Sequence, residues 1–211
     1  MNSDAACRLY LITPPAIDDL SEFAARLPAV LDAGDVACLQ VRLKPVDDDT
    51  VKRAVAALLP VCDAADVAVI LNDRPDLAAT LGCDGVHIGP EDTPYAEARR
   101  IVGPDATVGV SAKTSRHTAM ALADAGADYI AFGAFYPSST KVNTEHATPD
   151  LLEIWTETTT VPCVAIGGIT PENCAPLISA GADFLAVSAG VWSHVDGPEV
   201  AVRLFSQKMA R

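Results

Sequence analysis

Short apolar, β-branched stretches alternate along this chain with longer stretches whose apolar residues recur at helical spacing. Each pair of stretches predicts one strand followed by one helix. The predicted strands cover residues 8–13, 37–43, 67–73, 84–89, 107–112, 129–134, 162–168 and 184–190. The clearest predicted helices cover residues 21–34, 49–65, 115–126 and 171–181.

The ends of the predicted helices carry residues that favour starting or ending a helix. Thr170 is a capping residue followed by Pro171 at a first helical position, and Gly34, Gly126 and Gly181 close helices. Eight strand and helix units in 211 residues predict an α/β fold, a (β/α)8 TIM barrel. A doubly wound open sheet is the alternative. Because no linker or change of composition divides the chain, we expect residues 1–211 to form a single domain.

Composition restricts the protein to one broad class. Half of the residues are hydrophobic, yet no charge-free apolar run reaches the eighteen residues expected of a membrane span. The N-terminus lacks the basic start and cleavage site of a secretory signal, and we expect a cytoplasmic protein. Cysteines 7, 38, 62, 83, 163 and 174 show no metal-binding spacing, so we interpret them as reduced and mostly buried thiols.

Charge argues against nucleic acid as a partner. Fifteen basic side chains against twenty-eight acidic ones leave a formal net charge of −13. A basic site on such a chain has to be local. Lys44, Lys113 and Lys141 each follow a strand-like run directly, although lysine is also common in ordinary loops.

In a TIM barrel the functional residues lie at the carboxyl ends of the strands. Gly167 and Gly168 follow the seventh predicted strand, where the backbone can come close to a ligand, and residues 187–190 offer further amides after the eighth. These two loops are a common phosphate site in barrels. The alternative is that the paired glycines only form a tight turn.

Two aspartates end neighbouring predicted strands. Asp73 closes the third strand, and Asp92 follows the fourth in the sequence GPED. Because adjacent parallel strands lie about 4.8 Å apart, the two loops can share one Mg²⁺. One or two carboxylates, completed by phosphate oxygens and water, are the usual ligands of that ion. Both positions also suit the cap of a following helix, which is the alternative.

Basic and hydroxyl side chains follow two other strands. Gln40, Arg42 and Lys44 alternate at the end of the second strand, so they point to one face, either the barrel interior or the helix layer. Burying them unpaired is costly, and a bound anion would remove that cost. Residues 138–141, Ser-Ser-Thr-Lys, add three hydroxyls and a cation suited to a diphosphate. A solvated turn is the alternative for this last motif.

Taken together, these motifs resemble the thiamine phosphate synthase family. The similarity runs from LYLIT to AVSAG and includes QVRLK, LNDRPDLA, DGVHIGPED, GVSA, STK and AIGGIT in the same order. It implies a TIM barrel that uses Mg²⁺ to join hydroxymethylpyrimidine diphosphate to a thiazole phosphate, which yields thiamine phosphate and pyrophosphate. Both implied partners are small molecules, with no nucleic acid and no membrane, and an oligomer is possible.

The resemblance also assigns roles to individual residues. It implies that Asp73 and Asp92 hold Mg²⁺ and that Ser111 lies near the reacting carbon or the leaving group. The implied ligands of the pyrimidine diphosphate are Gln40, Arg42, Lys44, Asn72 and Lys141. The implied ligands of the thiazole phosphate are Ser138, Thr140, Gly168, Ser188 and Ala189. In the implied reaction the diphosphate leaves first, stabilised by Mg²⁺, Arg42, Lys44 and Lys141, and the thiazole nitrogen then captures the pyrimidinylmethyl cation.

Five positions differ from the family's usual pattern. Pro90 replaces a glutamine, Lys113 replaces a histidine, Ser138 replaces a threonine, and Ser188-Ala189 stands where Val-Ser is usual. Two other functions remain open. One is a thiazole tautomerase, whose proton transfer uses a histidine at the position of Lys113, and the other is a non-catalytic barrel that binds a phosphorylated ligand.

Overall fold

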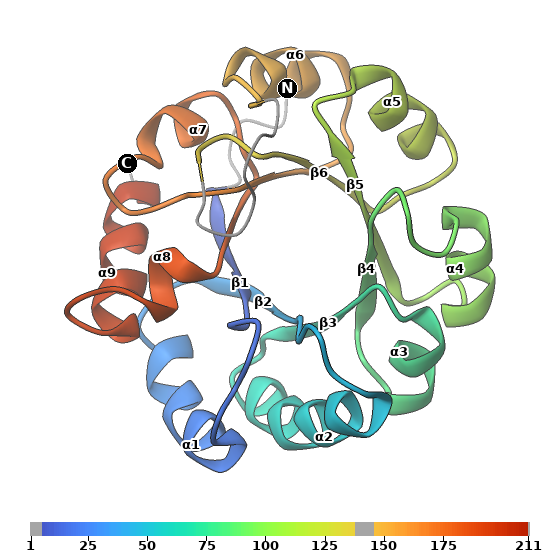
Figure 1. Ribbon diagram of the computed structural model, residues 1–211. Coiled ribbons are helices and arrows are strands. Elements are labelled where there is room, and N and C mark those ends of the chain that lie inside the picture. Colours follow the sequence, from blue (N-terminus) through green and yellow to red (C-terminus); the bar gives the residue numbers. More distant parts are fainter. Residues whose placement is uncertain (1–5, 138–145, 211) are drawn as a thin grey trace.

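The protein forms a closed barrel of parallel strands in a computed structural model that describes residues 6–137 and 146–210. The strands pair in chain order from β1 to β8, and β1 also pairs with β8. Figure 1 shows the strands as an inner ring and the helices as an outer ring around it. The predicted TIM barrel is therefore confirmed. The open sheet is wrong, because residues 8–11 of the first strand pair in parallel with residues 184–187 of the last strand and close the sheet.

All eight predicted strands are present, each within two residues of its predicted start. They are β1 Arg8–Ile12, β2 Val36–Val41, β3 Ala68–Asn72, β4 Gly85–Ile88, β5 Thr107–Lys113, β6 Tyr129–Gly133, β7 Cys163–Ile166 and β8 Phe184–Val187. The helices are α1 Leu20–Leu31, α2 Asp48–Ala64, α3 Pro75–Leu81, α4 Tyr95–Val102, α5 Arg116–Asp124, α6 Asp150–Thr158, α7 Ala175–Ser179, α8 Ala189–Trp192 and α9 Pro198–Met209. Within these described elements, no helix has the length and hydrophobicity needed to cross a bilayer.

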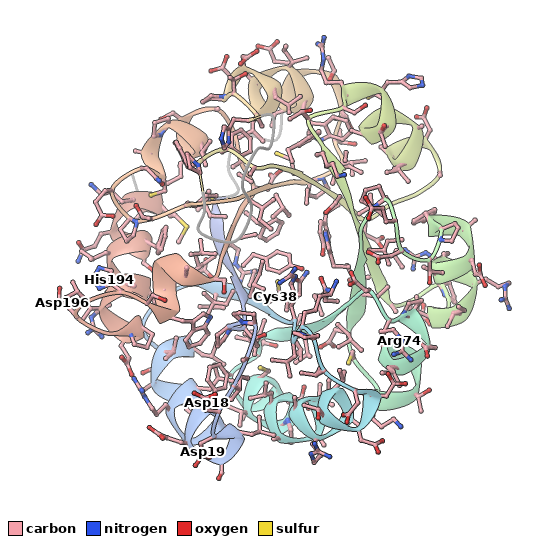
Figure 2. All side chains as sticks on the ribbon, viewed as in Figure 1. Asp18, Asp19, Cys38, Arg74, His194 and Asp196 are labelled. Carbon is pink, nitrogen blue, oxygen red and sulfur yellow. The ribbon has the colours of Figure 1, made fainter. Side chains whose placement is uncertain are left out.

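The hydrophobic core has two parts, which follow from the alternation of side chains along a strand. One set of strand residues packs outward against the helices and forms the larger cluster. The other set points into the barrel, where Cys38, labelled in Figure 2, lies among Tyr10, Ile70, Tyr129 and Val164. The interior is thus filled with side chains, as in other barrels of this class, and the carboxyl ends of the strands form the mouth where functional residues of this fold lie.

One level of the interior joins four consecutive strands. Asn72 pairs in register with His87, His87 with Gly109, and Gly109 with Tyr129. These positions share the inward face of β3, β4, β5 and β6, so the side chains of Asn72, His87 and Tyr129 point into the barrel at one level. The polar groups at this level lie directly below the mouth.

At the opposite end of the barrel, three aspartates make the same contact. Asp84, Asp128 and Asp183 immediately precede β4, β6 and β8, and each carboxylate accepts the backbone N–H of a residue on the preceding strand. The acceptor distances are 2.6–2.8 Å. These contacts stabilise the barrel on the side away from the mouth, where residues usually contribute to stability and not to catalysis.

The helix predicted at 171–181 is wrong at its start. Residues 171–173 form a turn, and α7 begins only at Ala175. The cause is Asn173, whose side-chain oxygen accepts the Thr170 N–H at 2.8 Å while its amide donates to the Gly168 carbonyl at 2.9 Å. Since Asx side chains compete with the helix for backbone groups, this local pairing delays the helix by one turn.

Candidate active site at the barrel mouth

The loops after β1 and β2 hold each other in place. The Thr13 hydroxyl accepts the Arg42 N–H at 3.0 Å and donates to the Arg42 carbonyl at 3.2 Å, and the Lys44 N–H donates to the Pro15 carbonyl at 3.0 Å. Thr13 itself is buried. The backbone that carries Arg42 and Lys44 is therefore anchored before any ligand is present, which lowers the cost of arranging these cations around an anion.

Lys44 lies in an ion pair with Asp73, the residue that follows β3. Asp73 has a left-handed backbone, φ 64°, and its N–H donates to the His87 carbonyl on β4 at 2.8 Å. Such a backbone is uncommon for a residue other than glycine and is often found where function requires it. Here it places the aspartate carboxylate on the rim of the mouth beside Lys44.

Asp73 also contacts the carboxyl group of Asp92. Burial and the neighbouring Asp92 raise the pKa of Asp73, while Lys44 acts in the opposite direction. Neither aspartate caps a helix, because α3 has Arg74 at its cap and α4 has Pro94. The Asp92 carboxylate instead accepts the Gly89 N–H at 2.8 Å within its own loop. The two carboxylates predicted as metal ligands thus lie together, and the alternative of helix caps is wrong.

The donor set at this position fits a hard divalent cation. Two partly desolvated carboxylates repel each other, and a cation between them removes that repulsion. Within residues 6–137 and 146–210, no cluster of three or more His, Cys, Asp or Glu side chains could hold a metal. A cation at Asp73 and Asp92 therefore needs further oxygen ligands from substrate or water, which is how proteins commonly bind Mg²⁺.

A cavity of about 240 Å³ opens next to this pair. Its walls include Lys44, Asn72, Asp73 and Arg74 together with apolar residues of β2 and β3. Arg74, labelled in Figure 2 beside α3, lies in ion pairs with Asp48 at the start of α2 and with Asp76. The charge of Arg74 is thus already paired twice, whereas Lys44 pairs directly with Asp73.

Gln40 and Ser111 face the barrel interior below the rim. Gln40 is buried and donates through Nε2 to the Tyr10 hydroxyl at 3.0 Å, and Ser111 Oγ lies 2.8 Å from His87 Nε2. Gln40 and Lys44 each have a partner within the protein, so these two residues do not need a bound anion to be paired. The charge of Arg42 lies close enough to His87 to help burial lower the pKa of the imidazole.

The loops after β7 and β6 pack closely together. A side chain at Gly168, whose φ is 64°, would come within 2.5 Å of the Pro137 carbonyl and 2.7 Å of the Tyr136 carbonyl. Only glycine allows this approach with this backbone. Gly168 therefore lies beside the start of the β6 loop, and the nearby Thr170 N–H is bonded to Asn173.

The loop after β8 uses its serine within the protein. Ser188 Oγ donates to the Thr13 carbonyl at 3.1 Å, so its hydroxyl links this loop to the loop after β1. Ala189 is exposed and begins the short helix α8. The next residue, Gly190, lies against the Ile169 carbonyl, where a Cβ would be only 2.3 Å away. The β7 and β8 loops are thus adjacent, as a shared phosphate site requires.

Three predicted ligands, Ser138, Thr140 and Lys141, lie outside the described residues. Lys113 is described and stands at the end of β5 with a left-handed backbone. Its side chain is 64% exposed, and Nζ lies 4.0 Å from Glu91 of the β4 loop. Lys113 is therefore an exposed cation beside the β4 loop.

Several residues at the end of β1 and in the interior below the mouth were not predicted from the sequence as part of a site. These are Tyr10, Thr13, His87, Gly109 and Tyr129, which contact Gln40, Arg42, Ser111 or one another. A polar residue on the inward side of an otherwise apolar strand was the available signal. Inward and outward sides could be distinguished only after the register of the barrel was known.

Comparisons with known proteins agree on one family. Residues 9–191 match the family described as thiamine monophosphate synthase. A thiamine-phosphate synthase of Rhodospirillum centenum is 60% identical over 96% of this chain and 98% of its own length, and one of Hyphomonas neptunium is 53% identical over 94% and 92%. A solved thiamine phosphate pyrophosphorylase from Pyrococcus furiosus superposes with a TM-score of 0.84 at 26% identity, covering 96% of this chain and 95% of that one.

Proposed function

This chain belongs to the thiamine monophosphate synthase family, and we propose that it joins hydroxymethylpyrimidine diphosphate to a thiazole phosphate at the mouth of its barrel. The products are thiamine phosphate and pyrophosphate. The C–O bond to the diphosphate breaks with its electron pair going to oxygen, and the thiazole nitrogen lone pair forms the new C–N bond. No proton needs to be transferred in this exchange.

One observation carries the assignment of the site. Lys44, Asp73 and Asp92 meet where β2, β3 and β4 end, and they combine a cation with two carboxylates of which one has a raised pKa. This combination supports binding of a diphosphate together with Mg²⁺, since the metal is held by both protein carboxylates and phosphate oxygens. When bound there, Mg²⁺ supplies positive charge to the departing diphosphate.

The protein's own groups then have separate tasks. Arg42 and Lys44 extend from the anchored β2 loop and offer charge-assisted hydrogen bonds to the diphosphate, and we assign Lys141 the same role from the sequence. Ser111 offers a hydroxyl near the breaking bond, and Asn72 an amide. Gln40, buried below them, orients the pyrimidine. Stabilisation of the leaving group and alignment of the two rings account for catalysis without a general base.

We assign the phosphate of the thiazole substrate to the adjacent loops after β6, β7 and β8. The close approach of Gly168 to the β6 loop and of Gly190 to Ile169 supports this placement. Ser138, Thr140, Gly168, Ser188 and Ala189 are the proposed ligands. Because the Ser188 hydroxyl donates to Thr13, the contribution from this turn is from backbone amides, which an alanine at 189 supplies as well as a serine.

Two alternatives receive less support. A tautomerase needs a proton-transfer histidine where Lys113 lies, and this residue is an exposed lysine 4.0 Å from Glu91. A barrel that only binds a phosphorylated ligand has no need of two adjacent carboxylates of which Asp73 has a raised pKa. We also propose that the reaction takes place in the cytoplasm, because the cysteines are free and five of the six are buried.

The test is a coupling assay with purified protein, both substrates and MgCl₂, followed by chromatography for thiamine phosphate and by a separate assay for pyrophosphate. We expect equal amounts of the two products, and no product when the metal is removed with a chelator and full recovery when Mg²⁺ is restored. Tautomerisation of the thiazole without coupling, or binding without turnover, would establish one of the alternatives instead.

A further inference from the structure

A continuous chain of hydrogen bonds crosses the barrel interior beneath the mouth. Gln40 Nε2 lies 3.0 Å from the Tyr10 hydroxyl, which lies 2.8 Å from the Tyr129 hydroxyl. Tyr129 lies 3.0 Å from His87 Nδ1, and His87 Nε2 lies 2.8 Å from Ser111 Oγ. Five strands contribute to it, and both ends are residues that the proposed function places against the pyrimidine substrate.

One direction of donation along this chain gives every hydroxyl proton an acceptor. An amide nitrogen only donates, so Tyr10 accepts from Gln40, and its own proton has the Tyr129 hydroxyl as an acceptor. Tyr129 then has its proton available for His87 Nδ1. The opposite direction would leave the Tyr10 proton without an acceptor in this chain of hydrogen bonds.

His87 is buried, and each of its two ring nitrogens lies within hydrogen-bond distance of a hydroxyl. A neutral imidazole carries one proton, and the acceptor role of Nδ1 places that proton on Nε2. His87 Nε2 then donates to Ser111 Oγ, and the Ser111 proton is left free for a group above it.

The packing around the two rings holds this arrangement in place. His87 and Tyr129 lie on either side of Gly109, with ring centroids 5.7 Å apart and planes inclined by 15°. Tyr129 also meets Tyr10 edge to face at 5.9 Å. Since all three rings are buried, the hydroxyls and the imidazole have little freedom to choose other partners.

We propose that His87 is a positioning residue for the synthase reaction, which orients the Ser111 hydroxyl so that its proton points into the mouth toward the departing diphosphate. The inference rests on the proposed function for the identity of the substrate. Tyr129 has the supporting role of fixing which ring nitrogen of His87 carries the proton. His87 itself need not touch either substrate.

The variants that test this role keep or remove a single donor. His87→Gln retains an N–H close to the position of Nε2, whereas His87→Leu retains only bulk. Ser111→Ala removes the hydroxyl, and Tyr129→Phe removes one oxygen from an otherwise unchanged ring. Steady-state kinetics with each substrate varied in turn, and thermal unfolding of each protein, form the basic measurements.

We expect His87→Leu and Ser111→Ala to lower kcat by a similar factor, about tenfold to a hundredfold, while the KM for the thiazole phosphate stays near that of the parent. The double variant should be no slower than either single one, because the two changes remove the same interaction. His87→Gln should recover most of the activity, and Tyr129→Phe should fall between parent and His87→Leu.

A different pattern would overturn the inference. If His87→Leu stays folded and active while Ser111→Ala is impaired, or if the two losses multiply in the double variant, His87 does not act through Ser111. If His87→Gln and His87→Leu lose equal activity, in proportion to their losses of thermal stability, His87 has only a packing role.

A spectroscopic measurement separates this inference from the proposed function. Long-range ¹H–¹⁵N NMR of the folded protein near pH 7 reports which nitrogen of each histidine is protonated, and loss of one signal in His87→Gln identifies His87. We expect the Nε2–H tautomer in the parent. The Nδ1–H tautomer would overturn the inference even in an active synthase, whereas an inactive protein with the Nε2–H tautomer would refute only the function.

Discussion

The ring of Tyr129 occupies the space that a side chain at position 109 would need. A Cβ built on Gly109 would lie 1.7 Å from Tyr129 Cζ and 2.2 Å from the two neighbouring ring carbons. The two residues are register partners on β5 and β6, and His87 is the partner of Gly109 on the other side. The missing side chain therefore lets the imidazole and the phenol meet.

Gly109→Ala is expected to destabilise the fold and to reduce turnover, because Tyr129 must leave its position. Overpacking a core commonly costs about 1–3 kcal/mol of unfolding free energy, and this contact is close enough to reach the upper end. Denaturant unfolding and the coupling assay measure both effects. Gly82→Ala is the control, since nothing lies within 4 Å of its Cβ and only its φ of 73° opposes the change. If both variants lose the same stability, the steric explanation fails.

Asp73→Asn and Asp92→Asn should each lower turnover by about a hundredfold or more while leaving thermal stability nearly unchanged. A metal ligand contributes several kcal/mol to the transition state, whereas removing one of two adjacent carboxylates also removes their repulsion in the folded protein. The Mg²⁺ concentration for half-maximal rate should rise. Asp49→Asn, which alters an exposed pair with Lys52 on α2, is the control. Unchanged metal dependence in both variants would contradict the assignment.

Lys141→Met should reduce the rate of coupling with little change in stability. The substitution keeps most of the side chain's length and removes its charge, so a contact to the leaving diphosphate is lost. The expected loss is about 2–4 kcal/mol of transition-state stabilisation, measured as kcat/KM for the diphosphate substrate. Lys52→Met, which removes an exposed cation from α2, should have normal kinetics. Normal kinetics in Lys141→Met as well would leave the 138–141 motif without a role.

Lys113→Ala should retain kinetics within about twofold of the parent, because an exposed ion pair such as that with Glu91 contributes only about 0–1 kcal/mol. Lys113→His should behave in the same way from pH 5.5 to 8 and should not tautomerise the thiazole substrate, since proton transfer also needs a placed carbon and a tuned pKa. A slow alanine variant whose activity the histidine variant restores only at low pH would show that Lys113 acts as a cation on the diphosphate.

The unfolding free energy of the parent should fall as the pH is lowered from about 6.5 to about 4. Folding lowers the pKa of His87 to about 4, so in this range the unfolded chain binds a proton that the folded protein does not. The full loss of unfolding free energy is about 3 kcal/mol, because each pH unit between the folded pKa and the ordinary pKa of histidine in the unfolded chain contributes about 1.4 kcal/mol. His87→Gln lacks this titrating group. The difference in unfolding free energy between the parent and this variant should therefore shrink as the pH falls toward about 4. Parallel curves would show that His87 is not held neutral by the fold.

Most of the fold could be predicted from the sequence, because its signals are local. Eight apolar runs of strand length, each followed by helical spacing, are visible without knowing which strands pair. Asp73 and Asp92 could be placed together for the same reason, since consecutive parallel strands are neighbours and their carboxyl ends meet on one side. The start of α7 was missed because one Asn173 side chain decides it, through bonds that compete with the helix.

The sequence by itself therefore determined the barrel's repeating unit and which strand ends lie at its mouth. Both follow from the order of strands and helices along the chain. Only the tertiary structure decided which polar residues meet inside. Tyr10 and Tyr129 are separated by 119 positions and touch across the barrel, and their contact depends on closure of β1 onto β8, on the stagger of every strand pair and on the empty position at Gly109. Such contacts arise from the summed geometry of all eight strands, which no local pattern of residues records.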